Sequence, residues 1–312
     1  MKKYAPYLIL FAAMLWATDA PFRNQLTQEL PSGFIVLAEH FVDVLVVLPV
    51  LWLNRKRLKD LSAKQWLAVV VIAVGGSALA SIAFTQAFHY VNPSVAILLQ
   101  KLQPVLAIGL AGVMLKEHMS SKFWLWAVVA LAGAYVITFP NLVPQLFPGE
   151  QFNPNLIGAG LALLAAALWG ASTALGRYVL GSADFKVMTS LRFTLAFVFL
   201  LALNLAQKTI PPLGSVSGRD WLYIAIIAVA SGVVSLFIYY RGLKDTKASV
   251  ATLAELGFPM AAVLVNWIFI TGSQLFWPQL LGMVVLLFAV YKLSGVNIGE
   301  SAPEFGAVPA RQ

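Results

Sequence analysis

The stretch from Trp66 to Glu117, which contains SVAIL at residues 94–98, occurs a second time from Trp221 to Gly272, which contains SVATL at residues 249–253. The two copies align without a gap at a shift of 155 residues. Each copy holds two long apolar segments joined by a short polar turn. A duplication of this kind in an apolar chain indicates a transporter built from two structural repeats.

The composition is that of a membrane protein. Of the 312 residues, 60% are apolar and 11% are charged, whereas soluble domains carry about 25% charged residues. We attribute the net charge of +8 to loops that face anionic lipid rather than to nucleic-acid binding. Because the chain has no cysteine, disulfides and thiolate–metal sites are excluded. Lys2-Lys3 precedes an apolar run without a cleavage site, so this run is predicted to be a retained helix.

Ten apolar segments of about 17 to 23 residues are each long enough to cross the hydrocarbon core as a helix. They cover residues 5–22, 33–53, 66–88, 93–115, 122–140, 157–177, 185–206, 221–240, 248–270 and 277–293. The sequence therefore predicts an all-α, polytopic membrane protein with ten transmembrane helices.

Lysine and arginine residues predict the orientation of these helices. If the N-terminus is cytoplasmic, most basic residues outside the helices fall in inner loops, and only Arg23, Lys208 and Arg219 fall in outer loops. This distribution favours an even number of spans with both termini in the cytoplasm.

A further match extends the duplication to the start of each half. Leu8–Trp16 aligns with Leu161–Trp169, which repeats the pair Leu-Trp. Each half then holds five helices, and because five is odd, the halves are predicted to be inverted repeats around a central cavity. The predicted divisions are a first repeat (1–140), an outer linker (141–156), a second repeat (157–294) and a disordered tail or vector-derived remnant (295–312).

The sequence resembles the EamA-type transporters of the drug/metabolite transporter superfamily. The resemblance rests on the repeated Leu-Trp pair, on NPSVAILLQKLQPVLA at residues 92–107 and on LKEHMSSKFWLWAVVALAGAYVI at residues 115–137. It implies that helices 1–4 and 6–9 surround a cavity while helices 5 and 10 are peripheral. It also implies export or exchange of a small organic metabolite, and a location in the plasma (inner) membrane. One departure is that Lys116-Glu117 corresponds to Thr271-Gly272 in the second copy.

Polar residues inside the predicted helices are candidates for substrate binding or coupling, because such residues are costly in a membrane. Near the outer end these are Asp19, Glu39, His40 and Asp43. Acidic groups beside Trp16 suit an ammonium group, through ion pairing and cation–π contact. Alternatively, Asp19 pairs with Arg23 one turn away, and Glu39 pairs with His40 or with a residue of helix 3. His40 is a candidate for proton coupling or for a structural hydrogen bond.

A second set of candidates lies deeper or nearer the inner end. Trp169 repeats Trp16, and Glu255 repeats the position of Gln100, so these four residues are expected to face the cavity. For Arg192 we expect either an ion pair with Glu255 that closes an inner gate or recognition of a substrate carboxylate. For Tyr239 the alternatives are cavity lining and interfacial anchoring.

Pro104 and Pro259 stand at the same position of the repeat. Proline removes a helical hydrogen bond and kinks a helix, so both are candidate hinges.

These residues favour a secondary transporter of a zwitterionic or cationic metabolite, such as an amino acid or amine, that works by alternating access with a proton or counter-substrate. The alternative is broad efflux of aromatic or cationic drugs. Only Lys101 and Arg192 could meet a phosphate, which disfavours sugar phosphates.

A channel and an intramembrane enzyme fit poorly. No nucleotide-binding, metalloprotease or serine-hydrolase motif is present, so we predict no enzyme activity, cofactor, metal or nucleic-acid partner. The expected partners are the substrate and the lipid bilayer, and the expected state is a monomer.

Overall fold

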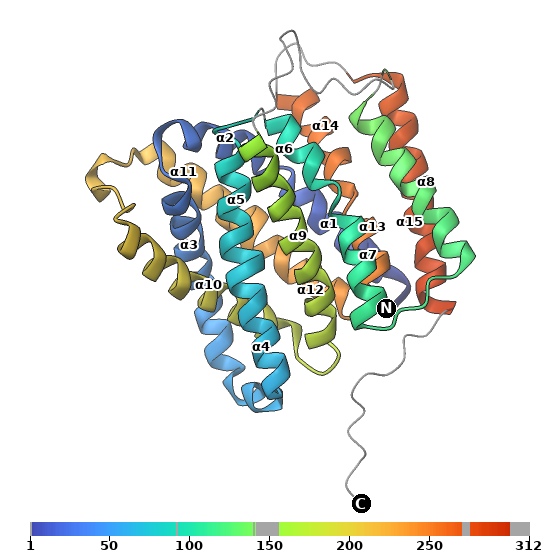
Figure 1. Cartoon of the computed structure of the whole chain (residues 1–312), viewed down its shortest axis with the longest axis horizontal. Coiled ribbons are helices and arrows are strands. Elements are labelled where there is room, and N and C mark those ends of the chain that lie inside the picture. Colours follow the sequence, from blue (N-terminus) through green and yellow to red (C-terminus); the bar gives the residue numbers. More distant parts are fainter. Residues whose placement is uncertain (1, 92, 140, 142–155, 270–274, 300–312) are drawn as a thin grey trace, which may run out of the picture.

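The computed structural model describes residues 2–91, 93–139, 141, 156–269 and 275–299, and these residues form helices and the turns between them (Figure 1). Ten helical spans are long and apolar enough to cross a membrane. The prediction of an all-α, polytopic membrane protein is therefore confirmed. The helices of the first half are α1 (Ala5–Trp16), α2 (Ala20–Glu29), α3 (Ser32–Leu53), α4 (Ala63–Val71), η3 (Ile72–Leu79), α5 (Ala80–Ala87), α6 (Pro93–Gln100), α7 (Gln103–Met114) and α8 (Ser121–Thr138). Those of the second half are α9 (Leu156–Val179), α10 (Phe185–Gln207), α11 (Gly218–Ile226), η5 (Ile227–Val234), α12 (Ser235–Leu243), α13 (Ala248–Ala254), α14 (Gly257–Phe269) and α15 (Trp277–Gly299). Three short 3-10 turns are η1 (Lys2–Tyr4), η2 (Arg55–Asp60) and η4 (Leu213–Ser215).

The first span is longer than the sequence suggested. It was expected to end at residue 22, but α1 and α2 together extend it to Glu29. The span bends between Trp16 and Ala20, where Pro21 starts the second part and supplies no backbone N–H. Arg23, which was expected in an outer loop, is consequently buried inside the span.

The C-terminal boundary also differs from the prediction. Residues 295–299 were assigned to the tail, but they continue α15. Nearly all of the expected linker and the rest of the expected tail lie outside the described residues. Thr271-Gly272 also lies outside them.

Several local features recur at the shift of the sequence repeat. Capping boxes join Ser62 to Gln65 before α4 and Ser217 to Asp220 before α11. The segments η3 and η5, which follow these helices, are both π-helical. A π-helical turn locally widens the helix and is common at functional sites. The two halves thus share specific backbone irregularities as well as their hydrophobic pattern.

Helices 4 and 9 are both interrupted near mid-length. The first break separates α6 from α7, and Pro104 follows it; the second separates α13 from α14, and Pro259 follows it. Because a proline nitrogen cannot donate to the preceding turn, the helix is weakest at these points. Whether the breaks act as hinges stays a prediction.

The packing of the helices is consistent with a two-fold relation between the halves. Helix 1 (α1) packs against helices 8 and 9 (α12 and α14), and helix 6 (α9) packs against helices 3 and 4 (α5 and α7). Helices 2 and 7 (α3 and α10) pack against each other, as do helices 5 and 10 (α8 and α15). If each helix of one half is exchanged with its counterpart in the other half, the same pairs of neighbouring helices result. The opposite insertion of the halves in the membrane stays a prediction.

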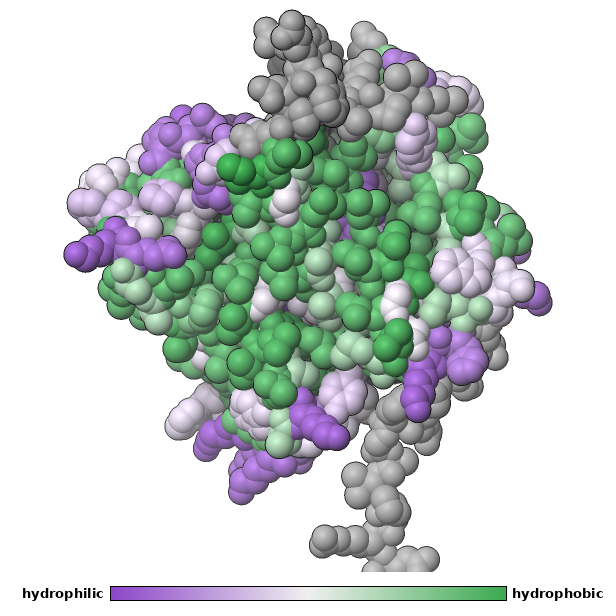
Figure 2. Space-filling view, viewed as in Figure 1, coloured by the Kyte–Doolittle hydropathy of each residue, from purple (hydrophilic) through white to green (hydrophobic). Residues whose placement is uncertain are grey.

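The surface and the chain ends agree with a bundle that spans a bilayer. Figure 2 shows a broad hydrophobic band with hydrophilic residues toward the two ends. Both ends of the helical region lie at the same end of the bundle (Figure 1), where the Ser294 hydroxyl donates to the Lys3 carbonyl at 2.5 Å. An even number of spans requires this arrangement.

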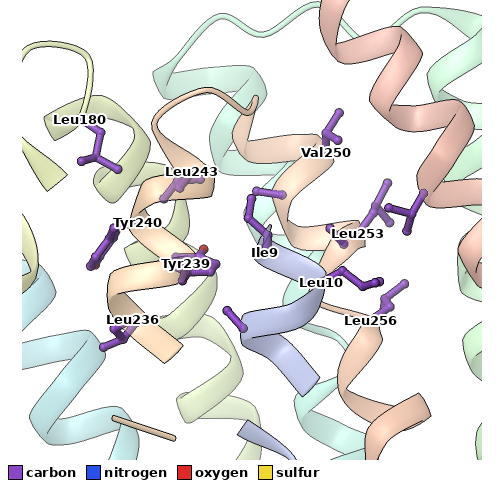
Figure 3. Packing of buried hydrophobic residues seen from close by; sticks show 14 of the residues in the cluster. Ile9, Leu10, Leu180, Leu236, Tyr239, Tyr240, Leu243, Val250, Leu253 and Leu256 are labelled. Atoms are coloured by element: carbon purple, nitrogen blue, oxygen red, sulfur yellow. The ribbon is translucent and has the colours of Figure 1, made fainter. Parts of the chain in front are cut away.

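The main hydrophobic core joins the two halves. Ile9 and Leu10 of α1 belong to one buried cluster with Leu243 of α12 and Leu253 of α13 (Figure 3). Since α1 belongs to the first half and α12 and α13 to the second, burial of apolar surface holds the halves together.

Glu117 connects the end of helix 4 to the start of helix 9. Its buried carboxylate accepts hydrogen bonds from the backbone N–H groups of Ala248 and Ser249, at 2.7 and 3.0 Å, and from the Ser249 hydroxyl, at 2.6 Å. These N–H groups belong to the first turn of α13, where no helical acceptor is available. Glu117 therefore satisfies donors that would otherwise be buried without a partner.

We expect Glu117→Ala to destabilise the protein by about 1–3 kcal/mol for each buried donor left unsatisfied. The measurement is thermal unfolding of the purified chain in detergent. Glu29→Ala, which removes an exposed carboxylate, is the control. If both variants unfold at the same temperature, the Glu117 contacts contribute nothing measurable.

A second prediction concerns the close contact between α8 and α15. A Cβ atom added at Gly282 would lie 2.8 Å from the Gly133 carbonyl oxygen, so Gly282→Ala must push the two backbones apart. We expect a loss of about 1–3 kcal/mol in thermal or denaturant unfolding. Gly295→Ala makes the same change on the same helix in open space, and its better helix propensity should leave stability equal or higher. If both variants lose the same stability, the close contact between α8 and α15 does not explain the effect of Gly282→Ala.

Candidate functional site

A cavity of about 180 Å3 lies between the two halves of the bundle. Each of helices 1–4 and 6–9 contributes to its wall, whereas among the described residues α8 and α15 contribute none. This is the arrangement that the resemblance implied, with helices 5 and 10 at the periphery.

The cavity wall contains every residue that the sequence suggested for substrate binding, coupling or gating. These residues are Trp16, Asp19, Glu39, His40, Asp43, Gln100, Trp169, Arg192, Tyr239 and Glu255. Their functional roles stay predictions. Pro104 and Pro259 line a smaller, adjoining cavity of about 30 Å3, which also includes Gln100 and Glu255.

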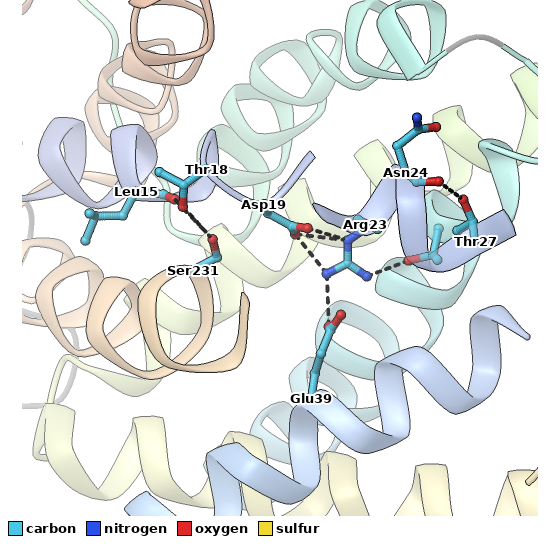
Figure 4. Close-up of polar contacts among 9 residues, drawn as sticks. Leu15, Thr18, Asp19, Arg23, Asn24, Thr27, Glu39 and Ser231 are labelled. Atoms are coloured by element: carbon cyan, nitrogen blue, oxygen red, sulfur yellow. Dashed lines mark hydrogen bonds and ion pairs between the residues drawn. The ribbon is translucent and has the colours of Figure 1, made fainter. Parts of the chain in front are cut away.

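Arg23 organises the polar groups at one side of the cavity (Figure 4). Its guanidinium donates to both Asp19 carboxylate oxygens, with Nε 2.7 Å from Oδ1 and Nη2 2.8 Å from Oδ2. Nη2 also donates to Glu39 Oε2 at 2.9 Å, and Nη1 donates to the Thr85 hydroxyl at 2.7 Å. One cation therefore joins helices 1, 2 and 3 through charge-assisted hydrogen bonds.

The cluster shows the partners of two candidate residues. Asp19 pairs with Arg23, as the one-turn spacing allowed, and Glu39 pairs with the same cation instead of His40 or a helix-3 residue. A role of either residue in substrate binding or coupling stays a prediction. Arg23 was missed as a site residue because its position beyond the expected end of helix 1 suggested a loop. Its spacing of four residues from Asp19 was the available signal.

Glu255 occupies a second polar cluster. Its Oε1 accepts hydrogen bonds from the Tyr239 hydroxyl at 2.7 Å and from the Thr173 hydroxyl at 3.2 Å, and its Oε2 accepts one from Gln103 Nε2 at 2.5 Å. Tyr239 is thus buried in the cavity wall rather than at the interface. Thr173 was also missed, although it lies one turn after Trp169 on α9.

Arg192 does not form the expected ion pair with Glu255. Its Nε donates to Ser77 at 2.5 Å, its Nη1 to the Tyr240 hydroxyl at 2.7 Å and its Nη2 to the Gly76 carbonyl at 3.1 Å. Neutral groups therefore hold Arg192, while three neutral donors already surround Glu255. The predicted gate ion pair is absent from the described structure, because each side chain is held by its own set of partners.

Aromatic side chains form much of the remaining wall. The Trp16 ring lies 5.3 Å from the Tyr239 ring, and the Trp169 ring lies 5.2 Å from the Phe84 ring, measured between centroids. The indole N–H groups bond within the protein, from Trp16 to the Ser235 hydroxyl and from Trp169 to the Gly76 carbonyl. These bonds fix the rings and leave their apolar atoms for contact with a ligand.

Comparisons with known proteins agree with this architecture. A model of the EamA-like transporter family matches residues 3–139 and 156–295. The riboflavin transporter ImpX of Fusobacterium nucleatum subsp. nucleatum is 29% identical over 296 residues, which cover 93% of this chain and 97% of that protein. An uncharacterized transporter of Clostridium kluyveri is 22% identical, with 89% of each chain covered.

A solved crystal structure shares the fold. It superimposes with a TM-score of 0.72 at 18% identity and covers 94% of this chain and 98% of its own. Because the family model matches both halves of the ten-helix bundle, the chain belongs to the EamA-like transporter family.

Proposed function

We propose that the protein is a secondary transporter of a small aromatic metabolite with polar edges, with riboflavin as the first candidate. The observation that carries this proposal is the pair Trp16 and Trp169, one from each half, on the wall of a shared cavity. Rings from both halves can hold a flat substrate by offset or edge-to-face contacts. The similarity to a protein named as a riboflavin transporter supports the same substrate.

The proposed mechanism is alternating access. The halves rock about the cavity, and the breaks before Pro104 and Pro259 act as hinges. Glu39, His40 and Asp43 are the candidates for coupling to protons or to a counter-substrate, because all three are ionisable groups in the wall. The proposal places the protein in the plasma (inner) membrane as a monomer with both termini in the cytoplasm, and the direction of transport is export or exchange.

A zwitterionic or cationic metabolite, such as an amino acid or amine, is the second candidate. Four carboxyl groups line the cavity, from Asp19, Glu39, Asp43 and Glu255, against the guanidinium groups of Arg23 and Arg192. This excess of acidic groups favours a positively charged ligand. Because Arg23 already pairs with Asp19 and Glu39, an ammonium group would have to compete with it for those two carboxylates.

Counterflow in proteoliposomes tests the proposal. Vesicles that contain the purified chain and unlabelled riboflavin should accumulate labelled riboflavin transiently and saturably. Flux of amino acids alone would favour the second candidate, and flux of many unrelated aromatic cations would favour broad drug efflux. Flux that does not saturate would identify a channel and overturn the proposal.

We expect Trp169→Ala to weaken riboflavin binding by at least about two- to tenfold, because one aromatic contact contributes about 0.5–1.5 kcal/mol. Titration followed by quenching of flavin fluorescence measures the affinity. Trp169→Phe keeps a ring and should retain most of it. Trp124 is half-exposed on α8, away from the cavity, so Trp124→Ala should bind as the unchanged chain does. If Trp169→Ala binds riboflavin with unchanged affinity, the Trp169 ring does not contact the ligand.

Glu39→Gln is expected to abolish flux while expression stays normal. The amide keeps an oxygen that can accept from Arg23, but it loses the negative charge and the ability to exchange a proton. Proteoliposome uptake measures the effect, and Glu29→Gln at an exposed position is the control. Unchanged flux in Glu39→Gln would exclude Glu39 from the mechanism.

A further inference from the structure

Three neighbouring side chains on α3 each leave one buried polar atom without a partner. Glu39, His40 and Asp43 are 5%, 5% and 2% exposed, and all three line the cavity. The atoms without a hydrogen bond are Glu39 Oε1, His40 Nε2 and Asp43 Oδ1. Buried polar atoms in native proteins normally have partners, so these three point to a ligand.

All three atoms are hydrogen-bond acceptors. His40 Nδ1 lies 2.9 Å from the Val36 carbonyl oxygen, and a carbonyl can only accept, so Nδ1 carries the proton. In a neutral imidazole the other nitrogen, Nε2, then has the free lone pair. The oxygens of Glu39 and Asp43 also accept when these side chains are ionised. In that state, the ligand group that satisfies this side of the cavity is a donor.

Arg192 offers the opposite chemistry. A guanidinium has five N–H groups, and those of Arg192 bond to Ser77, Gly76 and Tyr240. None of the four ion pairs found among the described residues involves Arg192. Its remaining N–H groups are donors on the cavity wall, and the ligand group that satisfies them must be an acceptor.

The two sets of atoms lie along one seam of the fold. Helices α3 and α10 pack against each other, and the His40 ring lies 5.7 Å from the ring of Phe193, the residue next to Arg192. Opposite α3, a Cβ atom at Gly232 of η5 would lie 2.6 Å from Asp43 Oδ1, so only glycine allows η5 to pack this closely against the oxygen.

We propose that the seam between α3 and α10 recognises the polar edge of the substrate: one of the acceptors on α3 binds an N–H group, and Arg192 binds an adjacent carbonyl oxygen. This inference rests on the proposed function. In riboflavin the imide edge has this pattern, because the N3–H group lies between two ring carbonyls. The aromatic wall then holds the ring system, and the seam selects ligands by the hydrogen-bonding pattern of this edge.

N3-methylriboflavin provides a direct test, because it keeps the ring and both carbonyls but cannot donate from N3. The unchanged full-length chain in detergent is titrated with both flavins, and quenching of flavin fluorescence gives the two affinities. We expect the methylated flavin to bind tenfold or more weakly, as the loss of a hydrogen bond to a charged group predicts. Asp43→Ala removes one acceptor and should reduce the ratio of the riboflavin affinity to the N3-methylriboflavin affinity. Glu29→Ala, at an exposed position, should leave this affinity ratio unchanged.

The outcomes separate the two proposals. If the unchanged chain binds both flavins equally well, the proposal that the seam recognises the imide edge is overturned, while the proposed function stands. If it binds neither flavin, the proposed function is overturned and the inference with it. A large affinity ratio in the unchanged chain that becomes smaller in Asp43→Ala supports both the proposed function and the recognition of the imide edge. Because the main comparison uses the unchanged chain, a variant that fails to fold does not affect it.

Discussion

Charged groups in a membrane-spanning bundle must find their partners inside the protein, since the surrounding hydrocarbon offers none. The Arg23 cluster shows how the chain meets this constraint. One guanidinium accounts for two carboxylates and a hydroxyl, so that three helices are held at one side of the cavity. Removal of Arg23 would leave the buried Glu39 and the partly buried Asp19 without this counterion. This single cation therefore links helices 1, 2 and 3 beside the cavity.

The same constraint explains why the helices are irregular where they meet the cavity. Helix 1 bends between α1 and α2, helices 4 and 9 break, and helices 3 and 8 widen into π-helical turns. At each of these irregularities the chain borders the cavity, where the backbone is not exposed to lipid. Regular packing continues instead in α8 and α15, which lie at the edge of the bundle (Figure 1).

Much of this architecture could be predicted from the sequence, because hydropathy and an internal repeat are long-range patterns. Ten spans and the wall position of Trp16 and Trp169 followed from them, whereas the peripheral position of helices 5 and 10 was implied by the resemblance to a known family. The partners of individual polar groups did not. Arg192 was expected to pair with Glu255 because both lie at similar depth, but depth does not say which way a side chain turns. Arg23 was misplaced because a run of polar residues after Pro21 resembles a loop, although this run forms the helix α2, and Arg23 lies on its buried face.

The contact made by Glu117 has a consequence for the symmetry of the two halves. The repeat places Gly272 at the corresponding position of the second half, and glycine has no carboxylate with which to hold the start of a helix. Three hydrogen bonds from Glu117 therefore join the end of helix 4 to the start of helix 9, whereas the sequence has no carboxylate at the repeat-related position 272. Any motion that separates the end of helix 4 from the start of helix 9 has to break these bonds. Two halves of similar fold can in this way differ in how firmly their helix ends are tied together.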